Sequence, residues 1–266
     1  SLFVASVAPG SAAARAGITP GMGIISINGR RPMRAPTDFA TRITLENSER
    51  IIDEALEAGP LQFETVAADG SRRTWTVAGA PSCQTRFEVA ADDDEQAYAD
   101  GDLVQVTAGM GEFTDGNDAE LASVIAHELA HNMLRHIDRT RDAGTPNNYQ
   151  RYLGRYARIS RKMEEEADRL SVWLLAIAGY DPRTPVNFWQ RFGPGHDSAH
   201  PFGRLHDRWQ VRVTAIEAEL ALMTTERRRN PRARPALLDQ RDVVPGQPAP
   251  TNAAPAATTT AAPVSH

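Results

Sequence analysis

The spacing of apolar residues changes once along this chain, from short alternating runs to long helical repeats, and it therefore predicts two domains. Residues 1–80 carry the alternating runs together with two stretches of helical spacing. Asp69-Gly70, between two of the runs, is a strong signal for a β-hairpin. We expect a small β-rich domain here, with strands over residues 3–7, 24–27, 61–65 and 74–77 and helices over residues 11–16 and 36–58.

Residues 84–228 form the second expected domain, which is mostly helical. Two alternating runs at its start, residues 86–90 and 103–107, predict a small sheet. Long apolar repeats with helical spacing follow them. The fold class expected for the whole chain is α+β, in which a small β-rich domain precedes a mostly helical domain.

Two helices of the second domain have clear end signals. Asn117 and Glu120 have the spacing of a capping box, so a helix should begin there and run through Met133. A longer helix should end at Gly179, because glycine adopts the left-handed conformation of a C-terminal cap without steric cost. This longer helix is expected over residues 149–178. A further helix is expected over residues 209–223.

The last part of the chain, residues 229–266, is expected to be a flexible tail. Residues 245–266 hold five Pro, seven Ala and four Thr and no Asp, Glu, Lys or Arg. Such a segment buries too little apolar area to offset the entropy of ordering it. Functional residues are therefore expected upstream of it.

The overall composition excludes several classes of protein. With 41% hydrophobic and 24% charged residues, the chain is neither disordered throughout nor fibrous. Its net charge of −5 gives no positive field for nucleic-acid binding, and we expect no nucleic-acid partner. No apolar run reaches the roughly 18–20 residues of a membrane span. The single cysteine, Cys83, excludes an internal disulfide and a cysteine-based zinc site.

The main chemical signal is the pentapeptide His127-Glu128-Leu129-Ala130-His131. Residues four apart share a helix face, so the two imidazoles leave it about 6 Å apart and can bind one zinc ion. Glu128 projects roughly 100° away around the helix axis, beside the ion. It is therefore expected to be the general base for a zinc-bound water that attacks a carbonyl. The alternative is a surface helix that carries two histidines near a carboxylate by chance.

A third ligand is expected on the helix that ends at Gly179. Glu164 can complete the three protein ligands of a catalytic zinc site, and Asp168, one turn later, can hydrogen-bond the far nitrogen of a ligating histidine. Glu165 and Glu166 are expected to face elsewhere. The alternative for this acidic run is a solvated face that pairs with neighbouring Arg and Lys residues.

The spacing of these residues resembles that of metallopeptidase family forty-eight, which contains the CAAX prenyl protease, the bacterial heat-shock membrane protease and soluble envelope relatives. The likeness covers about residues 86–215. It implies a zincin fold of the gluzincin type and one Zn²⁺ per chain. The residues that carry it are His127-Glu128-Leu129-Ala130-His131, His136, Glu164, Ala167-Asp168, residues 96–101 and 106–109, Gly179-Tyr180-Asp181-Pro182 and His200-Pro201.

Residues around this His-Pro pair have further expected roles. In the family, a basic residue after the pair helps to hold the oxyanion of the transition state. A loop histidine such as His196 can also reach the open zinc position as a latch, although an ordinary surface histidine is the alternative. His136 lies five residues after His131, points off the metal-binding face and is expected to be a structural hydrogen bonder. The oxyanion or loop candidates are His200, Arg204 and Arg208.

Residues 1–80 resemble a PDZ domain of bacterial envelope proteases. The likeness lies in residues 4–21 and in the run that continues to Asn28-Gly29. The first strand and the carboxylate-binding loop of such a domain, which should precede Phe3, are missing from this sequence. The resemblance implies docking of a peptide or a partner by strand addition, and a packing or regulatory role is the alternative.

Together these features predict a zinc-dependent endopeptidase that cuts unfolded or extended proteins, in quality control of the bacterial cell envelope. The expected location is the periplasm, and an anchor is expected, if at all, before Ser1. The predicted strand over residues 103–107 is expected to be an edge strand that pairs with the substrate. The alternative function is a non-catalytic PDZ-type adaptor with a structural zinc site.

Overall fold

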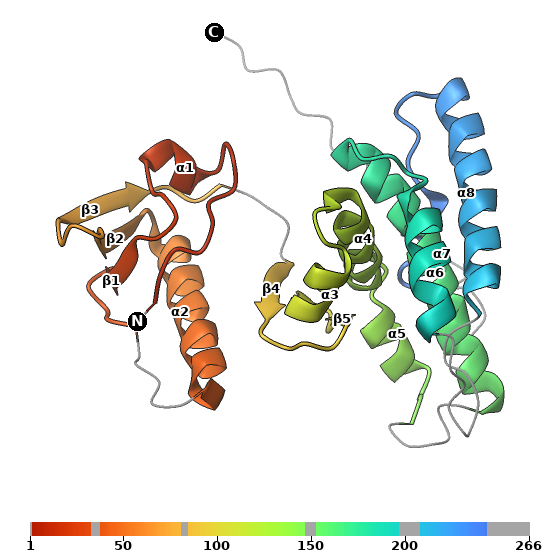
Figure 1. Cartoon of the computed structure of the whole chain (residues 1–266), viewed down its shortest axis with the longest axis horizontal. Coiled ribbons are helices and arrows are strands. Elements are labelled where there is room, and N and C mark those ends of the chain that lie inside the picture. The colour runs from red at the N-terminus through yellow and green to blue at the C-terminus, as the bar shows by residue number, and fades with distance from the viewer. Residues whose placement is uncertain (1, 33–37, 81–84, 147–152, 197–207, 244–266) are drawn as a thin grey trace, which may run out of the picture. The chain divides into compact units, whose positions relative to one another are not determined.

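The computed structural model describes residues 2–32, 38–80, 85–146, 153–196 and 208–243. The chain divides into two compact units, Ser1–Cys83 and Gln84–His266 (Figure 1). Among the described helices, none combines the length and the hydropathy needed to cross a bilayer.

The first unit contains a three-stranded antiparallel sheet of order β1-β2-β3. Trp75 lies in its core, where the indole Nε1 donates to Thr65 Oγ1 at 2.7 Å. The predicted hairpin around Asp69-Gly70 is present as β2 and β3. The elements are α1 (Ala12–Ala16), β1 (Gly23–Ile27), α2 (Asp38–Ala58), β2 (Leu61–Val66) and β3 (Arg72–Val77).

The prediction of a strand over residues 3–7 is wrong. Only Phe3 forms a bridge, with Gly23, and Val4 exchanges hydrogen bonds with residues 21–22. The chain then leaves this pairing and turns at Gly10, which has a φ of 70°. Burial does not alternate here, because Phe3 is 59% exposed whereas Val4 and Val7 pack against the core, and the segment has no continuous strand partner.

The second unit combines a three-stranded sheet with helices. The sheet order is β4-β6-β5, with β4 parallel and β5 antiparallel to β6. The strands are β4 (Arg86–Ala90), β5 (Ala97–Ala99) and β6 (Leu103–Thr107). The helices are α3 (Ala108–Phe113), α4 (Asp118–Met133), α5 (His136–Asp142), α6 (Gly154–Ala178), α7 (Thr184–His196) and α8 (Trp209–Arg229), followed by the 3₁₀-helix η2 (Ala236–Gln240).

The prediction that residues 103–107 form an edge strand is wrong, because β6 lies between the two other strands. Four of its five side chains are buried, as expected for a strand with a neighbour on each side. Alternation in the sequence identified the strand, but the order of strands depends on pairing partners that are distant in the sequence. The edges of this sheet are β4 and β5.

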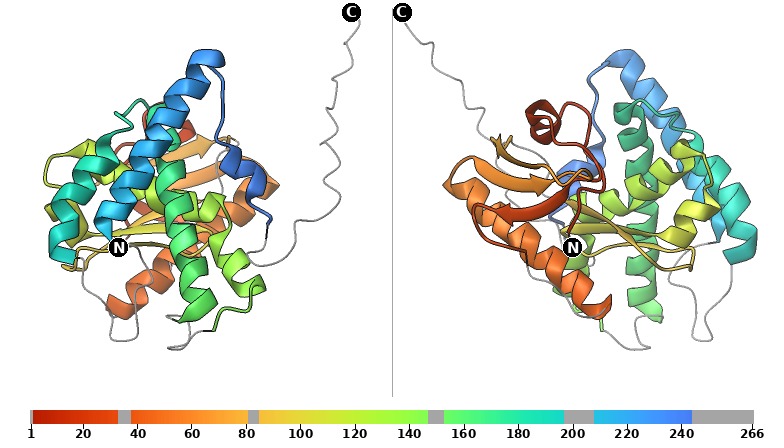
Figure 2. Two further views of the ribbon diagram at one scale, coloured as in Figure 1. Left: turned by 90° about the vertical axis from the view of Figure 1, so that its right-hand side faces the viewer. Right: turned by 60° about the vertical axis from the view of Figure 1, so that its left-hand side comes forward.

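Local signals set the ends of the two helices that carry the predicted chemistry. The Asn117 side chain accepts from the backbone N–H of Glu120 at 3.2 Å and caps α4, and Gly179 ends α6 in the left-handed region at φ 86°. The two helices pack side by side, and α8 packs along α6 and α7 (Figures 1 and 2). The core between them holds Ala130, Leu134, Ala167, Leu170, Trp173, Val213, Ile216 and Leu220.

Part of the expected flexible tail is folded, so that prediction is wrong for residues 230–243, which we call the C-terminal strap. Leu237 is buried in the main core, Arg135 pairs with Asp242 at 2.7 Å, and Arg139 Nε donates to the carbonyl of Val243 at 2.9 Å. Only the residues beyond the strap have the composition that opposes burial, and residues 244–266 lie outside the described part of the chain.

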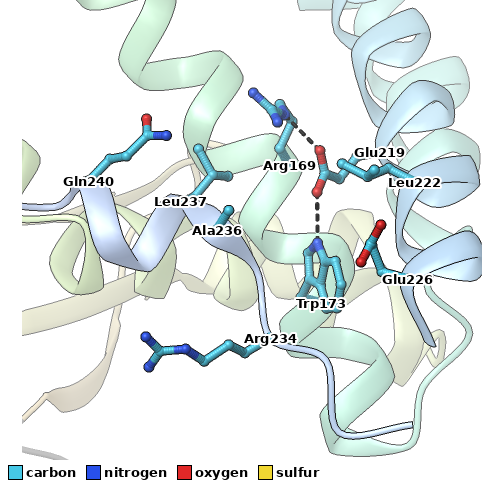
Figure 3. Close-up of a pocket in the computed structure, with 9 residues that line it drawn as sticks. All are labelled: Arg169, Trp173, Glu219, Leu222, Glu226, Arg234, Ala236, Leu237 and Gln240. Carbon is cyan, nitrogen blue, oxygen red and sulfur yellow. Dashed lines mark hydrogen bonds and ion pairs between the residues drawn. The ribbon is translucent and has the colours of Figure 1, made fainter. Parts of the chain in front are cut away.

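The strap also forms one wall of a pocket of about 300 Å³ (Figure 3). Helices α6 and α8 form the other walls, where Arg169 and Trp173 both donate to the buried carboxylate of Glu219 at 2.7 Å. Leu237 and Gln240 line the pocket from the strap side. The strap therefore contributes to the packing of the two long helices.

Candidate metal centre

Three predicted ligands come together where α4 faces α6. The Nε2 atoms of His127 and His131 lie 3.1 Å apart, and the two Glu164 oxygens lie 3.4 and 3.5 Å from them. Zinc bonds of 2.0–2.1 Å in a tetrahedral site separate neighbouring donors by about 3.3 Å. The nitrogen and oxygen donors therefore fit a single zinc ion, and among the described residues they form the one such cluster found.

Asp168 contacts the far side of His127. Its Oδ1 lies 3.0 Å from Nδ1 of that imidazole, and the side chain is 2% exposed. Helix periodicity explains the arrangement, because Asp168 follows Glu164 by one turn on the same face of α6. The hydrogen bond directs Nε2 of His127 toward the ligand cluster.

Arg212, at the start of α8, is a residue of this site that the sequence analysis missed. Its guanidinium donates to both oxygens of Asp168 at 2.7 Å and lies 3.5 Å from Glu164. It also stacks on the Trp189 ring, 3.8 Å from the ring centroid. One signal could have identified it: Arg212 precedes Ile216 by four residues and so occupies an apolar-face position of the helix.

His131 has a different partner on its far side. Its Nδ1 lies 2.9 Å from Nδ1 of His136, whose Nε2 lies 3.3 Å from the Glu166 carboxylate. Arg139 pairs with the same carboxylate at 2.8 Å. Glu166 is not among the clustered donors, in line with the expectation that it faces elsewhere, but it lies in the interior rather than on a solvated charged face. Its side chain is 6% exposed and points toward α5, whereas the neighbouring Glu165 is exposed.

Glu128 lies on α4 between the two ligand histidines and is half-buried. Burial opposes the charge of Arg212, but Asp168 above all, followed by Glu164 and then Glu128, raises the pKa of that guanidinium. The carboxylate of Glu128 is thus placed in the same electrostatic environment as the ligand cluster.

The remaining candidates are not assembled here. His200 and Arg204 lie outside the described residues. Arg208 is exposed at the N-cap of α8, one turn before Arg212. His196 does not join the ligands as a latch: its Nδ1 donates to the Phe192 carbonyl at 2.9 Å and its Nε2 pairs with Glu95 at 3.0 Å.

Burial and hydrogen bonds shift the two ligand imidazoles in opposite directions. Burial opposes protonation of His127, but hydrogen bonds with Asp168 and Glu164 outweigh it and raise its pKa to about 10. Burial lowers the pKa of His131 to about 3. At neutral pH and without metal, His127 is therefore an imidazolium and His131 is neutral.

These pKa values predict that zinc binding strengthens as the pH rises. A metal must displace the second ring proton of His127, and a lower pH favours that proton over the metal. We expect the apparent zinc affinity to rise about tenfold per pH unit between about pH 6 and 9, with release of about one proton. Titration against a competing chelator at several pH values measures the affinity, and calorimetry in buffers of different ionisation enthalpy counts the proton. An affinity that does not depend on pH would contradict this assignment.

Replacing Asp168 by Asn should weaken zinc binding about 10- to 100-fold, because the amide is a poorer acceptor for Nδ1–H of His127. Competition with a chromogenic chelator measures this loss. The exposed Asp142→Asn on α5 is the matched control and should bind zinc like the wild type. Equal affinities for all three proteins would show that Asp168 does not orient the ligand.

Comparison with known proteins points to one group of metalloproteases. Residues 60–145 match the sequence model of peptidase family M48, a range that includes both ligand histidines and ends before Glu164. Mitochondrial metalloendopeptidase OMA1 of Arabidopsis thaliana is 30% identical over 145 residues, which cover 46% of this chain and 30% of that protein. The OMA1 of Schizosaccharomyces pombe is 26% identical over 215 residues, which cover 71% and 64%.

A bacterial protein also matches. The beta-barrel assembly-enhancing protease of Yersinia pestis is 29% identical over 164 residues, which cover 50% of this chain and 33% of that protein. The chain therefore spans less than two thirds of the length of each of these relatives. The matches support a metalloprotease of peptidase family M48, a family that implies a metal cofactor, typically zinc.

Proposed function

We propose that this chain is a zinc-dependent endopeptidase of the gluzincin type, with one zinc ion per chain. The observation that carries the proposal is the convergence of His127, His131 and Glu164 at the donor separations of a tetrahedral zinc site. Three protein ligands leave the fourth position for water and substrate. A closed structural site would have no use for the carboxylate of Glu128 beside it.

The residues divide the chemistry of peptide hydrolysis between them. Bound zinc would polarise the substrate carbonyl and acidify a water molecule. Glu128 accepts the proton of the attacking water and passes it to the leaving amine. Asp168 and Arg212 hold the ligand side chains: the first orients His127, and the second neutralises the buried carboxylates of Asp168 and Glu164.

We further propose that an extended substrate pairs with β5. This strand is an edge of the sheet and lies against α4, the helix that carries both ligand histidines. A free strand edge offers backbone groups to an unfolded chain without selecting its sequence. Tyr98, on β5, is 39% exposed and would contact side chains of that substrate.

The function is tested by the products formed from unfolded casein. The purified, zinc-loaded chain should release internal fragments, identified by mass spectrometry, and a chelator should stop cleavage until zinc is restored. Products trimmed only from one end would indicate an exopeptidase instead. A folded, zinc-loaded chain that cleaves no substrate would favour the adaptor alternative.

The first unit is proposed as a PDZ-like docking domain, residues 1–80, ahead of a catalytic domain of residues 84–228. Its small antiparallel sheet and two helices are compatible with peptide binding by strand addition. Fluorescence anisotropy with a library of C-terminal peptides tests this, and loss of binding when the peptide carboxylate is amidated would support it. The absence of binding by every peptide would leave this unit a packing or regulatory role.

A bacterial cell envelope location, in the periplasm, and a role in protein quality control also remain proposals. One matched relative is named for assembly of β-barrels, which supports the envelope, whereas two are named mitochondrial. Fractionation of cells that express the tagged, full-length protein tests the location. Recovery in the cytoplasmic fraction would contradict it.

A further inference from the structure

The two ligand histidines have unlike partners on the sides that face away from the metal position. Nδ1 of His127 contacts a carboxylate, Asp168. Nδ1 of His131 instead contacts a second imidazole, Nδ1 of His136, at 2.9 Å. At that distance one nitrogen must carry a proton and the other must offer its lone pair, because two protons or two lone pairs would repel.

The groups behind His136 decide the direction of this hydrogen bond. Its Nε2 lies 3.3 Å from Glu166, whose carboxylate is paired with Arg139 at 2.8 Å. An ionised carboxylate only accepts hydrogen bonds, so Nε2 of His136 must be the protonated nitrogen. Arg139 already balances the charge of Glu166 and His136 is buried, so its imidazole is neutral; Nδ1 of His136 is then the acceptor, and His131 donates its Nδ1–H. The lone pair of His131 is thereby left on Nε2, which faces His127 and Glu164.

The residues of this hydrogen-bonded chain are buried, and Arg139 has further partners. The side chains of His136, Arg139 and Glu166 are each 6% exposed or less. Arg139 is also fixed to the backbone carbonyls of Leu134, at 3.4 Å, and Val243, at 2.9 Å. Water therefore has little access to this hydrogen-bonded chain, and few competing partners remain for its polar atoms.

We infer that His136 is a positioning residue of the metal centre: backed by Glu166 and Arg139, it fixes the tautomer of His131 and so presents Nε2 of His131 to the metal. This inference rests on the proposed metal site. In it, His136 orients the ring of His131 by a hydrogen bond to Nδ1, as Asp168 orients the ring of His127. Orientation by such an outer partner is worth about 10- to 100-fold in metal affinity.

The first test does not require a metal. Nitrogen-15 NMR of the histidine rings in the metal-free wild type distinguishes protonated from unprotonated ring nitrogens. We expect His131 to carry its proton on Nδ1 and His136 to carry its proton on Nε2. A proton on Nε2 of His131 would overturn the inference.

The second test compares zinc affinities of substitutions at one position. His136→Leu removes the acceptor and should lose about 10- to 100-fold in affinity. His136→Gln should retain affinity within about threefold of the wild type, because its amide oxygen accepts from His131 and its amide N–H donates to Glu166. A leucine variant that binds zinc like the wild type, or a glutamine variant as weak as leucine, would overturn the inference.

A matched pair on α6 keeps the test decisive if His136→Leu does not fold. Glu166→Gln removes the charge behind His136 and should weaken zinc binding, whereas Glu165→Gln, at the adjacent exposed position, should not. Equal affinities for this pair would also contradict the inference. Wild-type protein that binds no zinc would instead contradict the proposed function, which keeps the two failures distinguishable.

Discussion

Replacing Glu128 by Gln should leave zinc bound and lower the rate of peptide cleavage by about 100-fold or more. The amide has nearly the same shape as the carboxylate but cannot accept a proton from the attacking water. A 100-fold loss corresponds to about 2.7 kcal/mol of transition-state stabilisation. Because Glu128 is not among the three clustered donors, the zinc content should stay at one per chain. Casein cleavage and elemental analysis of the same preparation measure both quantities.

The control for this substitution is Glu112→Gln, which changes an exposed glutamate on α3 and should leave activity and zinc content unchanged. Zinc loss in Glu128→Gln would mean that the residue is a ligand rather than a base. If the wild type and Glu128→Gln both hold zinc and neither cleaves any substrate, the general-base assignment and the endopeptidase proposal both fail. The adaptor with a structural site would then be the better description.

Much of the fold could be predicted because its signals are local. The Asn117 cap, the Gly179 cap and the Asp69-Gly70 turn each depend on residues within one turn, and all three are present. Two predictions that depended on distant contacts were wrong: the edge position of residues 103–107 and the flexible tail over residues 230–243. The sequence gives no local sign that β6 lies between β4 and β5, or that Leu237 is buried under the strap.

The difference between local signals and distant contacts also explains which residues of the candidate site could be predicted. Helix spacing alone predicts that His127 and His131 share a face and that Asp168 lies one turn beyond Glu164. In the structure, His127 and His131 lie together with Glu164, and Asp168 lies against His127. Spacing marks Arg212 as a buried position of α8 but does not assign it to this site, because it reaches the site from a separate helix, 44 residues after Asp168.

The partners of His131 show a further limit of prediction from the sequence. His136 was expected to be a structural hydrogen bonder, and its contacts with His131 and Glu166 fit that description. Glu166 and Glu165 are adjacent and chemically identical in the sequence. Helix spacing places Glu166 on the apolar face, three residues after Met163 and four before Leu170, whereas Glu165 is exposed. Spacing does not show, however, that the partners of the internal acid are His136 and Arg139, because these residues come from a different helix, α5.

Glu164→Gln should cost more zinc affinity than any substitution behind the histidines, a loss greater than about 100-fold. The carboxylate supplies a charged oxygen donor between the two imidazoles, and a neutral amide is a far weaker ligand for a divalent cation. The loss of the negative charge also leaves Arg212 and an unbalanced positive field beside the metal position. Cleavage should fall with the metal content, and competition titration with a chelator measures the affinity directly.

The matched control is again the adjacent position. Glu165→Gln removes the same charge from the same helix, but its carboxylate is exposed and pairs with Arg169, so zinc affinity should not change. Loss of zinc in both variants would indicate a general effect of charge on α6 rather than ligation. Retention of zinc in Glu164→Gln, with His131→Ala still abolishing it, would exclude Glu164 as a ligand. The gluzincin assignment would then fail, because it requires a glutamate from a second helix to complete the site.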